Sequence, residues 1–104
     1  RIFKELKTLN FFIKEIPNLK PISELYKLEE LNFVDTDVES LKPLSSLLNL
    51  KRLYCFGSNV KSIKEILHLT NLEILQTDYS IPLNEINVLK KNNPNCKINQ
   101  NTWG

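Results

Sequence analysis

His68 is the only histidine of this 104-residue chain and the first place to look for acid–base chemistry. It lies between Leu67 and Leu69, in a stretch where apolar residues recur every three positions. A catalytic histidine needs a nucleophile or a second titratable group within hydrogen-bond reach, and the pattern places none beside it. We interpret His68 as a solvated surface residue and expect no catalytic residues in this chain.

Asp35 and Asp37 form the one acidic pair that suggests a cation site. Calcium sites collect six or more oxygen ligands, commonly in a glycine-containing acidic loop, and no such loop surrounds this pair. Aspartates also favour turns, because their side chains hydrogen-bond to the nearby backbone. Gly57 and Gly104 are the only glycines, too few for a phosphate-binding loop. We therefore predict a turn at 35–37, no metal and no cofactor.

Cys55 and Cys96 are the only cysteines, too few for a disulfide framework. Both fall at positions where the chain otherwise carries large apolar residues, so we expect two buried thiols, about 10 Å apart and too distant to form a disulfide. The low number of cysteines and the absence of an Asn-x-Ser/Thr glycosylation site favour a cytoplasmic location. The chain lacks methionine, so residue 1 is a processing site or a boundary within a longer sequence, and a secreted or effector protein stays open.

The composition is that of a soluble globular protein, with 41% hydrophobic and 25% charged residues and a net charge of +2. The 14 basic residues are matched by 12 acidic ones and scattered, which argues against a nucleic-acid partner. No apolar run approaches the roughly 18 residues that span a bilayer, so we expect no membrane insertion. The length predicts a single domain over residues 1–104.

A repeat of 22 residues organises the chain into four units, which begin near Leu6, Leu28, Leu50 and Leu72. The repeat has seven columns: Leu6, Leu28, Leu50 and Leu72; Leu9, Leu31, Leu53 and Leu75; Phe11, Phe33, Cys55 and Thr77; Ile16, Val38, Val60 and Ile81; Leu19, Leu41, Ile63 and Leu83; Ile22, Leu44, Ile66 and Ile86; and Leu25, Leu47, Leu69 and Leu89. Only Thr77 is not apolar. A one-residue deletion in the fourth unit predicts a partial fifth strand at 95–99, with Cys96 and Ile98 in the leucine places.

Two periods coexist inside each unit. A spacing of two, as between Leu31 and Phe33, indicates a strand, whereas the spacing of three that starts at Leu41 indicates a 3₁₀ or short helical turn. Pro21 and Pro43 lie at the start of that turn, where a missing N–H costs nothing. One such unit cannot bury its own apolar face, so we predict that the units stack and that their strands form a parallel sheet.

The run Leu28-x-x-Leu31-x-Phe33-x-x-Thr36-x-Val38, followed by Leu41-x-x-Leu44-x-x-Leu47, resembles the leucine-rich repeat. It is most similar to the 22-residue class of phosphatase-regulator-type and bacterial internalin-like proteins. The resemblance implies an α/β right-handed solenoid, with a parallel sheet on its concave face and short helical or 3₁₀ returns on its convex face. Asparagine usually occupies the ninth position of this repeat, where it ties neighbouring turns together. Lys14, Thr36, Ser58 and Ser80 replace it here, and hydroxyls can make part of those hydrogen bonds.

The residues between the leucine columns should point out of the concave face. Phe12, Val34 and Phe56 would then form an apolar line across neighbouring strands. Glu30 and Arg52 would pair across strands, and Asp78 and Lys97 would form a polar rim. The predicted partner-binding residues are Phe12, Val34, Arg52, Tyr54, Phe56, Ile74, Gln76 and Asp78. The alternative is that the aromatic side chains only pack on each other and stabilise the sheet.

The predicted function is non-enzymatic binding of a protein partner through the concave sheet. One alternative is an inhibitor, immunity or effector protein that occludes a partner enzyme. Another is a structural fragment of a longer solenoid that self-associates through its N-terminal edge, around Ile2 and Phe3. At the other end of the chain, Trp103 belongs either to a frayed tail or to a lid over the last repeat, and the lid is favoured because that end needs covering.

Overall fold

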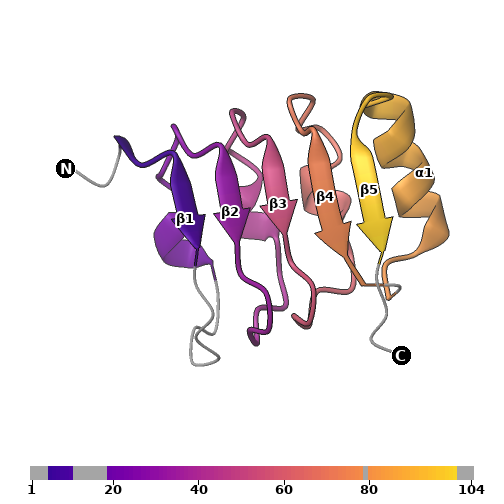
Figure 1. Ribbon diagram of the computed structural model, residues 1–104, viewed down its shortest axis with the longest axis horizontal. Helices are drawn as coiled ribbons and strands as arrows, with labels where there is room; N and C mark the ends of the chain where they lie inside the picture. The colour runs from indigo at the N-terminus through magenta and orange to yellow at the C-terminus, as the bar shows by residue number, and fades with distance from the viewer. Residues whose placement is uncertain (1–4, 11–18, 79, 101–104) are drawn as a thin grey trace.

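The computed structural model describes residues 5–10, 19–78 and 80–100. Five short strands are separated by helical segments, and Figure 1 shows them side by side along the long axis of the molecule. In chain order the elements are β1 (Thr8–Asn10), η2 (Lys20–Ile22), β2 (Glu30–Asn32), η3 (Lys42–Leu44), β3 (Arg52–Tyr54), η4 (Lys64–Ile66), β4 (Ile74–Thr77), α1 (Leu83–Asn92) and β5 (Lys97–Gln100).

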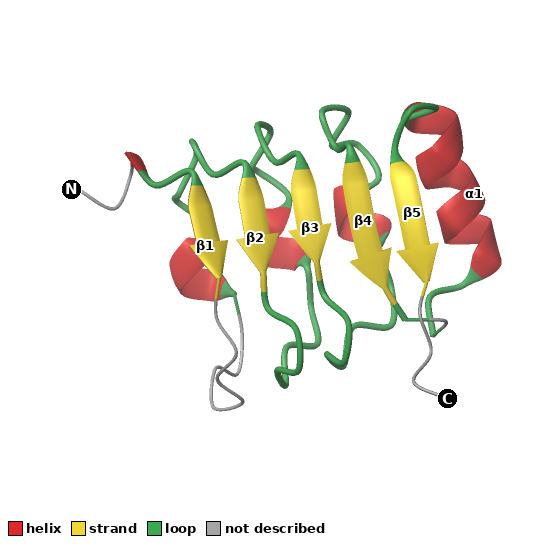
Figure 2. Ribbon diagram, in the orientation of Figure 1, coloured by secondary structure: helices red, strands yellow, loops and turns green. Residues whose placement is uncertain are grey.

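The strands form one parallel sheet in chain order, from β1 to β5. Leu31 pairs with Leu9 on one side and with Leu53 on the other, and Leu53 pairs with Leu75, so the 22-residue repeat sets the register. The helical segments lie behind the sheet in Figure 2. This arrangement confirms the predicted solenoid, with its parallel sheet on one face and its helical returns on the other.

The returns of the first three units are 3₁₀ turns of three residues, called η2, η3 and η4. Pro21 and Pro43 lie in the first turn of η2 and η3, as predicted. Proline suits this position because its φ angle is already close to the helical value and its missing N–H would have no partner there. Because side chains three apart align on a 3₁₀ turn, Leu41 and Leu44 both face the sheet and are fully buried.

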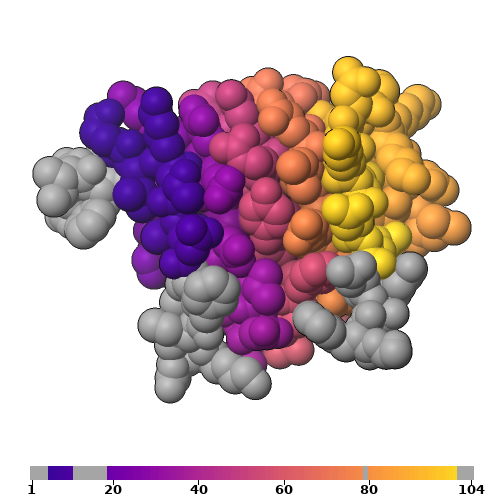
Figure 3. All heavy atoms as spheres, in the orientation of Figure 1, coloured from indigo at the N-terminus to yellow at the C-terminus, as the bar shows by residue number. Residues whose placement is uncertain are grey.

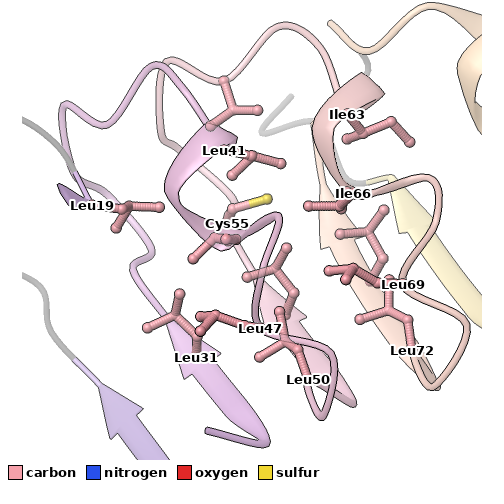
Figure 4. Packing of buried hydrophobic residues seen from close by; sticks show 14 of the residues in the cluster. Leu19, Leu31, Leu41, Leu47, Leu50, Cys55, Ile63, Ile66, Leu69 and Leu72 are labelled. Carbon is pink, nitrogen blue, oxygen red and sulfur yellow. The ribbon is translucent and has the colours of Figure 1, made fainter. Parts of the chain in front are cut away.

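The core lies between the sheet and these turns. Figure 4 shows the side chains of Leu31, Leu41, Leu47 and Cys55 packed together in it. The second and third units bury all seven of their repeat columns. Leu6, Leu9 and Leu25 of the first unit are half-buried, and Phe11 and Ile16 lie outside the described residues. The apolar columns of the repeat therefore form the core, as the sequence predicts.

Leu83 was expected in the core, and that expectation is wrong: its side chain is 69% exposed. The return of the fourth unit is α1, an α-helix of 10 residues in place of a 3₁₀ turn. An α-helix advances by 100° per residue and not by 120°, so residues three apart drift around its surface. Glu85 and Leu89, four apart, therefore share the buried face with Ile86, while Leu83 turns outward.

The fifth strand lies two residues later than predicted. Ile98, not Cys96, pairs with Leu75, and Lys97 pairs with Ile74. The α-helix rises about 1.5 Å per residue against about 2.0 Å for a 3₁₀ helix, so α1 uses more residues to cross the same face. Cys96 consequently leaves the core column in which it was expected and is only half-buried.

Hydrogen bonds replace the missing asparagine column in part. The hydroxyls of Thr36 and Ser58 donate to main-chain carbonyls of their own turns, at 2.9 Å and 2.6 Å, and Ser80 donates to Val60 O of the neighbouring unit at 3.2 Å. Lys14, which breaks the column, lies outside the described residues. Only the hydroxyl of Ser80 therefore joins two units, as asparagine would, whereas those of Thr36 and Ser58 bond within their own turns.

Asparagines before the strands link neighbouring units directly. Asn49 Nδ2 donates to Tyr26 O at 3.2 Å, and Asn71 Nδ2 donates to Leu48 O at 2.9 Å. The sequence analysis missed these links. Their signal is the Asn-Leu pair that recurs at 49–50 and 71–72, one repeat apart.

Candidate functional site

The open face of the sheet carries two complete rows of side chains, one residue from each strand. Strand pairing defines the first row as Thr8, Glu30, Arg52, Ile74 and Lys97, and the second as Asn10, Asn32, Tyr54, Gln76 and Asn99. Along strands β2, β3 and β4, the residues of these two rows alternate with buried residues. Figure 3 looks onto this face, where the strands lie in front, and shows their side chains joined in one continuous surface.

A third, shorter row lies at the carboxyl ends of the strands. Phe33 N donates to Tyr54 O at 3.0 Å and Asp35 N donates to Phe56 O at 2.9 Å, which places Val34 beside Phe56. Asp78 continues this row one unit further on, and its carboxylate accepts a hydrogen bond from Gly57 N. The predicted neighbourhood of Val34 and Phe56 is thus observed, whereas Phe12, the third member of the apolar line, lies outside the described residues.

The described members of the predicted binding set are all on this face, and all are half-buried; they are Val34, Arg52, Tyr54, Phe56, Ile74, Gln76 and Asp78. Partial burial indicates that these side chains pack against one another as well as facing outward.

The predicted pair between Glu30 and Arg52 is present. Arg52 Nε lies 2.7 Å from Glu30 Oε1, and its Nη1 lies 3.9 Å from Glu73 Oε1. The hydrogen bond to Glu30 is the main reason why the pKa of Arg52 is raised above its ordinary value. The pair fixes the guanidinium beside Tyr54 and neutralises the charge in the middle of the first row.

Asp35 and Gly57 occupy the same position in successive units, and both have left-handed backbone, with φ of 61° and 69°. Asp35 lies in the turn after β2, as expected for the pair at 35 and 37. Among residues 5–10, 19–78 and 80–100, no group of three or more His, Cys, Asp or Glu side chains is placed so that it could hold a metal ion.

His68 lies in the turn that directly follows η4, outside the strands. Its side chain is exposed, as predicted, and its Nε2 lies 2.6 Å from Ser45 O of the preceding unit. This contact makes it a bridge between two neighbouring turns. Trp103, Ile2 and Phe3 lie outside the described residues, so the expected lid and the N-terminal edge have no structural description here.

The two thiols differ. Cys55 is fully buried, as expected, and burial raises the pKa of its thiol to about 12. Cys96 was also expected to be buried, but it is half-buried because of the shift of β5; burial raises its pKa as well. Both cysteines are free.

Tyr26 and Leu48 are two exposed apolar residues that the sequence analysis did not single out. Their side chains are 53% and 58% exposed, more than any described apolar residue of the predicted binding set. They precede β2 and β3 and lie one repeat apart, so they stand on neighbouring units. The available signal was that two large apolar residues lie one repeat apart at this position, although Lys4 and Thr70 occupy it one repeat earlier and one repeat later.

No protein-family model and no curated protein sequence matches the chain. Solved structures do. An internalin from Listeria monocytogenes superposes with a TM-score of 0.76 at 19% identity over 91% of this chain, and internalin C2 from the same organism with 0.76 at 20% over 92%. A leucine-rich-repeat protein of Leptospira interrogans superposes with a TM-score of 0.72 at 30% identity over 91%. The chain spans 28%, 42% and 25% of the lengths of these three proteins.

The 22-residue repeat, the parallel sheet and the similarity to these solved structures together define the fold as a leucine-rich-repeat solenoid. Within that class, the fold is of the internalin-like kind. In the part of the chain that the structure describes, no helix has the length and hydropathy needed to cross a lipid bilayer.

Proposed function

We propose that this protein binds a protein partner through the concave face of its sheet and does so without catalysis. The observation that carries the proposal is the set of apolar and aromatic side chains that neighbouring strands place next to one another. Tyr54 lies on β3, and Val34 lies beside Phe56 at the carboxyl ends of β2 and β3. Aromatic side chains that enter a partner's pocket commonly contribute 2 kcal/mol or more to binding, about the level of an interface hot spot.

The surroundings of these side chains also support binding. The second row places the carboxamides of Asn32 and Gln76 on either side of Tyr54. Asn32 Oδ1 already accepts a hydrogen bond from Val34 N, which fixes its orientation. A central aromatic residue flanked by oriented polar groups is the arrangement found in specific protein interfaces. The same fold in internalins and in a leucine-rich-repeat protein adds support from analogy.

Paired variants test the proposal. The double variant Tyr54→Ala/Phe56→Ala removes the aromatic surface of the concave face, and Tyr26→Ala/Leu48→Ala removes exposed apolar side chains from the turns before β2 and β3. Each variant is immobilised beside the parent and exposed to an extract of the source organism. Retained proteins are identified by mass spectrometry, and their affinities are then measured by calorimetry with purified components.

We expect that the parent and the Tyr26→Ala/Leu48→Ala variant retain a partner that the Tyr54→Ala/Phe56→Ala variant loses. All three proteins should have the same circular dichroism spectrum, which shows that they are folded. If the Tyr26→Ala/Leu48→Ala variant loses a partner that the Tyr54→Ala/Phe56→Ala variant retains, the binding surface lies at Tyr26 and Leu48 and not on the concave face. Light scattering on the parent alone tests the self-association alternative, because a monomer at high concentration contradicts it.

A further inference from the structure

We propose that a cleft at the amino ends of β4 and β5 binds a primary carboxamide, the group at the end of glutamine and asparagine side chains, and that Asn93 is the residue that recognises it. The cleft is separate from the concave face, because its lining contains no member of the predicted binding set. The inference goes beyond the proposed function and does not depend on it.

The cleft lies between the turn that precedes β4 and the loop that joins α1 to β5. It has a volume of about 350 Å³ and is lined by residues 70–73 and 92–96. Both segments lie at the same end of the sheet, at the top of Figure 1. Sites for small molecules have volumes of roughly 300 to 1,000 Å³, so this cleft has room for a side chain or a small ligand.

The carboxamide of Asn93 is buried without a hydrogen-bond partner. The residue is only 5% exposed, and neither Nδ2 nor Oδ1 is hydrogen-bonded in the part of the chain that the structure describes. Native proteins leave few buried polar groups in this state, because an unpaired amide is costly to bury. The main chain of Asn93, in contrast, is held at both ends: its N–H donates to Leu89 O and its carbonyl accepts from Cys96 N.

The preceding units show which bond is missing. The asparagines before β3 and β4 each donate to a main-chain carbonyl 23 residues earlier. The same spacing leads from Asn93 to Thr70, and both residues line the cleft, but Asn93 makes no such bond. Asn92, the last residue of α1, contacts the preceding unit in its place and donates to Leu67 O at 2.7 Å. The cleft is therefore lined by two groups that the earlier units join directly.

Asn93 can turn its carboxamide into the cleft without breaking a bond. The two polar atoms are covered in the free protein, but they make no hydrogen bond that a new rotamer would lose. Rotation about the side-chain bonds also leaves both main-chain hydrogen bonds in place. A ligand that pairs with Oδ1 and Nδ2 then gives them partners at no loss of an internal bond.

The polar groups of the cleft favour a neutral ligand that both donates and accepts. An ammonium or guanidinium group has no acceptor and would leave Asn93 Nδ2 unpaired, whereas a carboxylate has no donor and would leave Oδ1 unpaired. Glu73, which also lines the cleft, carries a negative charge that disfavours an anion. A primary carboxamide pairs with both atoms of Asn93 and has a second N–H left for Thr70 O.

Three compounds of nearly the same shape test the chemistry. Propionamide donates and accepts, whereas propionate and butanone only accept. Each is titrated into the ¹⁵N-labelled protein, and the amide signals of residues 70–73 and 92–96 are followed by NMR. We expect propionamide to shift these signals with a Kd of about millimolar, as suits so small a ligand, and the other two compounds to bind about tenfold more weakly or less.

Asn93→Leu tests the residue, because leucine has a similar shape and no polar atoms. It should weaken propionamide binding by about tenfold or more. Because the carboxamide has no partner in the free protein, this variant should unfold at the same urea concentration as the parent, or at a higher one. Asn59→Leu is the matched control: it makes the same substitution at an exposed asparagine after β3, outside the cleft, and should leave the affinity unchanged.

A peptide distinguishes the two sources of a carboxamide. Acetyl-Ala-Gln-Ala-methylamide is compared with propionamide and with its counterparts that carry glutamate or methionine at the centre. If the glutamine peptide binds about tenfold more tightly than propionamide, the ligand is a side chain of a partner protein. If it binds no more tightly, the ligand is a free small amide.

Three results would overturn the inference. The first is butanone or propionate binding as tightly as propionamide, or no saturable shift with any of them. The second is propionamide binding that survives in Asn93→Leu. The third is a lower urea midpoint for Asn93→Leu, which would show that the carboxamide holds the fold together, as the missing bond to Thr70 would. The proposed function stands in each case, because Tyr54 and Phe56 lie outside the cleft.

Discussion

The main-chain N–H of Ile63 donates a 2.8 Å hydrogen bond to the carboxylate of Glu85, 22 residues further along the chain. The hydroxyl of Ser62 donates to the same carboxylate, at 3.0 Å and 3.1 Å. Glu85 is only 5% exposed, so these donors satisfy a charge that would otherwise be costly to bury. The bond joins α1 to Ile63 at the start of η4. It explains how α1 can bury the acidic side chain of Glu85 in a fold whose other buried residues are mostly leucine and isoleucine.

Removing this carboxylate should destabilise the protein. In Glu85→Ala, Ile63 N and Ser62 lose their acceptor, and we expect a loss of about 1 to 3 kcal/mol in the free energy of unfolding. Glu85→Gln keeps a neutral acceptor and should lose less. Urea denaturation followed by circular dichroism measures both. The neighbouring exposed residue provides the control, because Asn84→Ala should change stability by no more than about 0.5 kcal/mol.

Two leucines that belong to the same repeat pattern should respond differently to truncation. Leu53 is fully buried in β3, and Leu53→Ala should cost roughly 2 to 5 kcal/mol because it leaves a cavity. Leu83 is exposed, so Leu83→Ala should cost less than about 0.5 kcal/mol. Equal losses of thermal stability in the two variants would contradict the position of α1.

Gly57 should tolerate no side chain. Gly57→Ala introduces a left-handed alanine, which costs about 1 to 2 kcal/mol, and its Cβ atom would overlap Asp35 Oδ1. In Gly57→Ala/Asp35→Gly the overlap is gone, and glycine suits the positive φ at position 35. Part of the lost stability should therefore return in the double variant. A double-mutant cycle measures that coupling, and strictly additive effects would show that the two turns do not touch.

The thiols should differ in reactivity. Iodoacetamide at neutral pH should modify the half-buried Cys96 first, and Cys55 only when the protein unfolds, because burial withholds both access and the reactive thiolate. Peptide mass spectrometry after a timed reaction identifies the modified residue. Faster modification of Cys55 than of Cys96 in the folded protein would contradict the observed burial.

Cys55 should also make stability depend on alkaline pH. Burial raises the pKa of its thiol from 9.0 to about 12 in the folded chain. The unfolded chain therefore releases this proton first, and the folded state loses stability as pH rises from about 9 towards 12. At pH 10 the loss should approach about 1.4 kcal/mol relative to Cys55→Val. Urea midpoints of both proteins at pH 7 and pH 10 measure it, and parallel shifts would contradict the prediction.

The strand positions of β1 to β4 and the outward direction of Tyr54 follow from the sequence alone. Strand side chains alternate with a period of two, so once the leucine columns are buried, the residues between them must face outward. The same repeat predicts the register, because equal units place equal positions side by side. Local chemistry also determined the proline-initiated 3₁₀ turns, since φ of proline suits the first helical position.

Tertiary structure decided the features that depend on contacts between units. Whether the last return is a 3₁₀ turn or the α-helix α1 depends on what packs against it, and the bond from Ile63 to Glu85 joins residues of two units. That choice turned Leu83 outward and moved Ile98 opposite Leu75. The meeting of Asp35 and Asp78 at Gly57 likewise depends on three turns from three units. A repeat pattern determines which face a residue occupies, whereas only the stacking of the units determines which side chains meet across them.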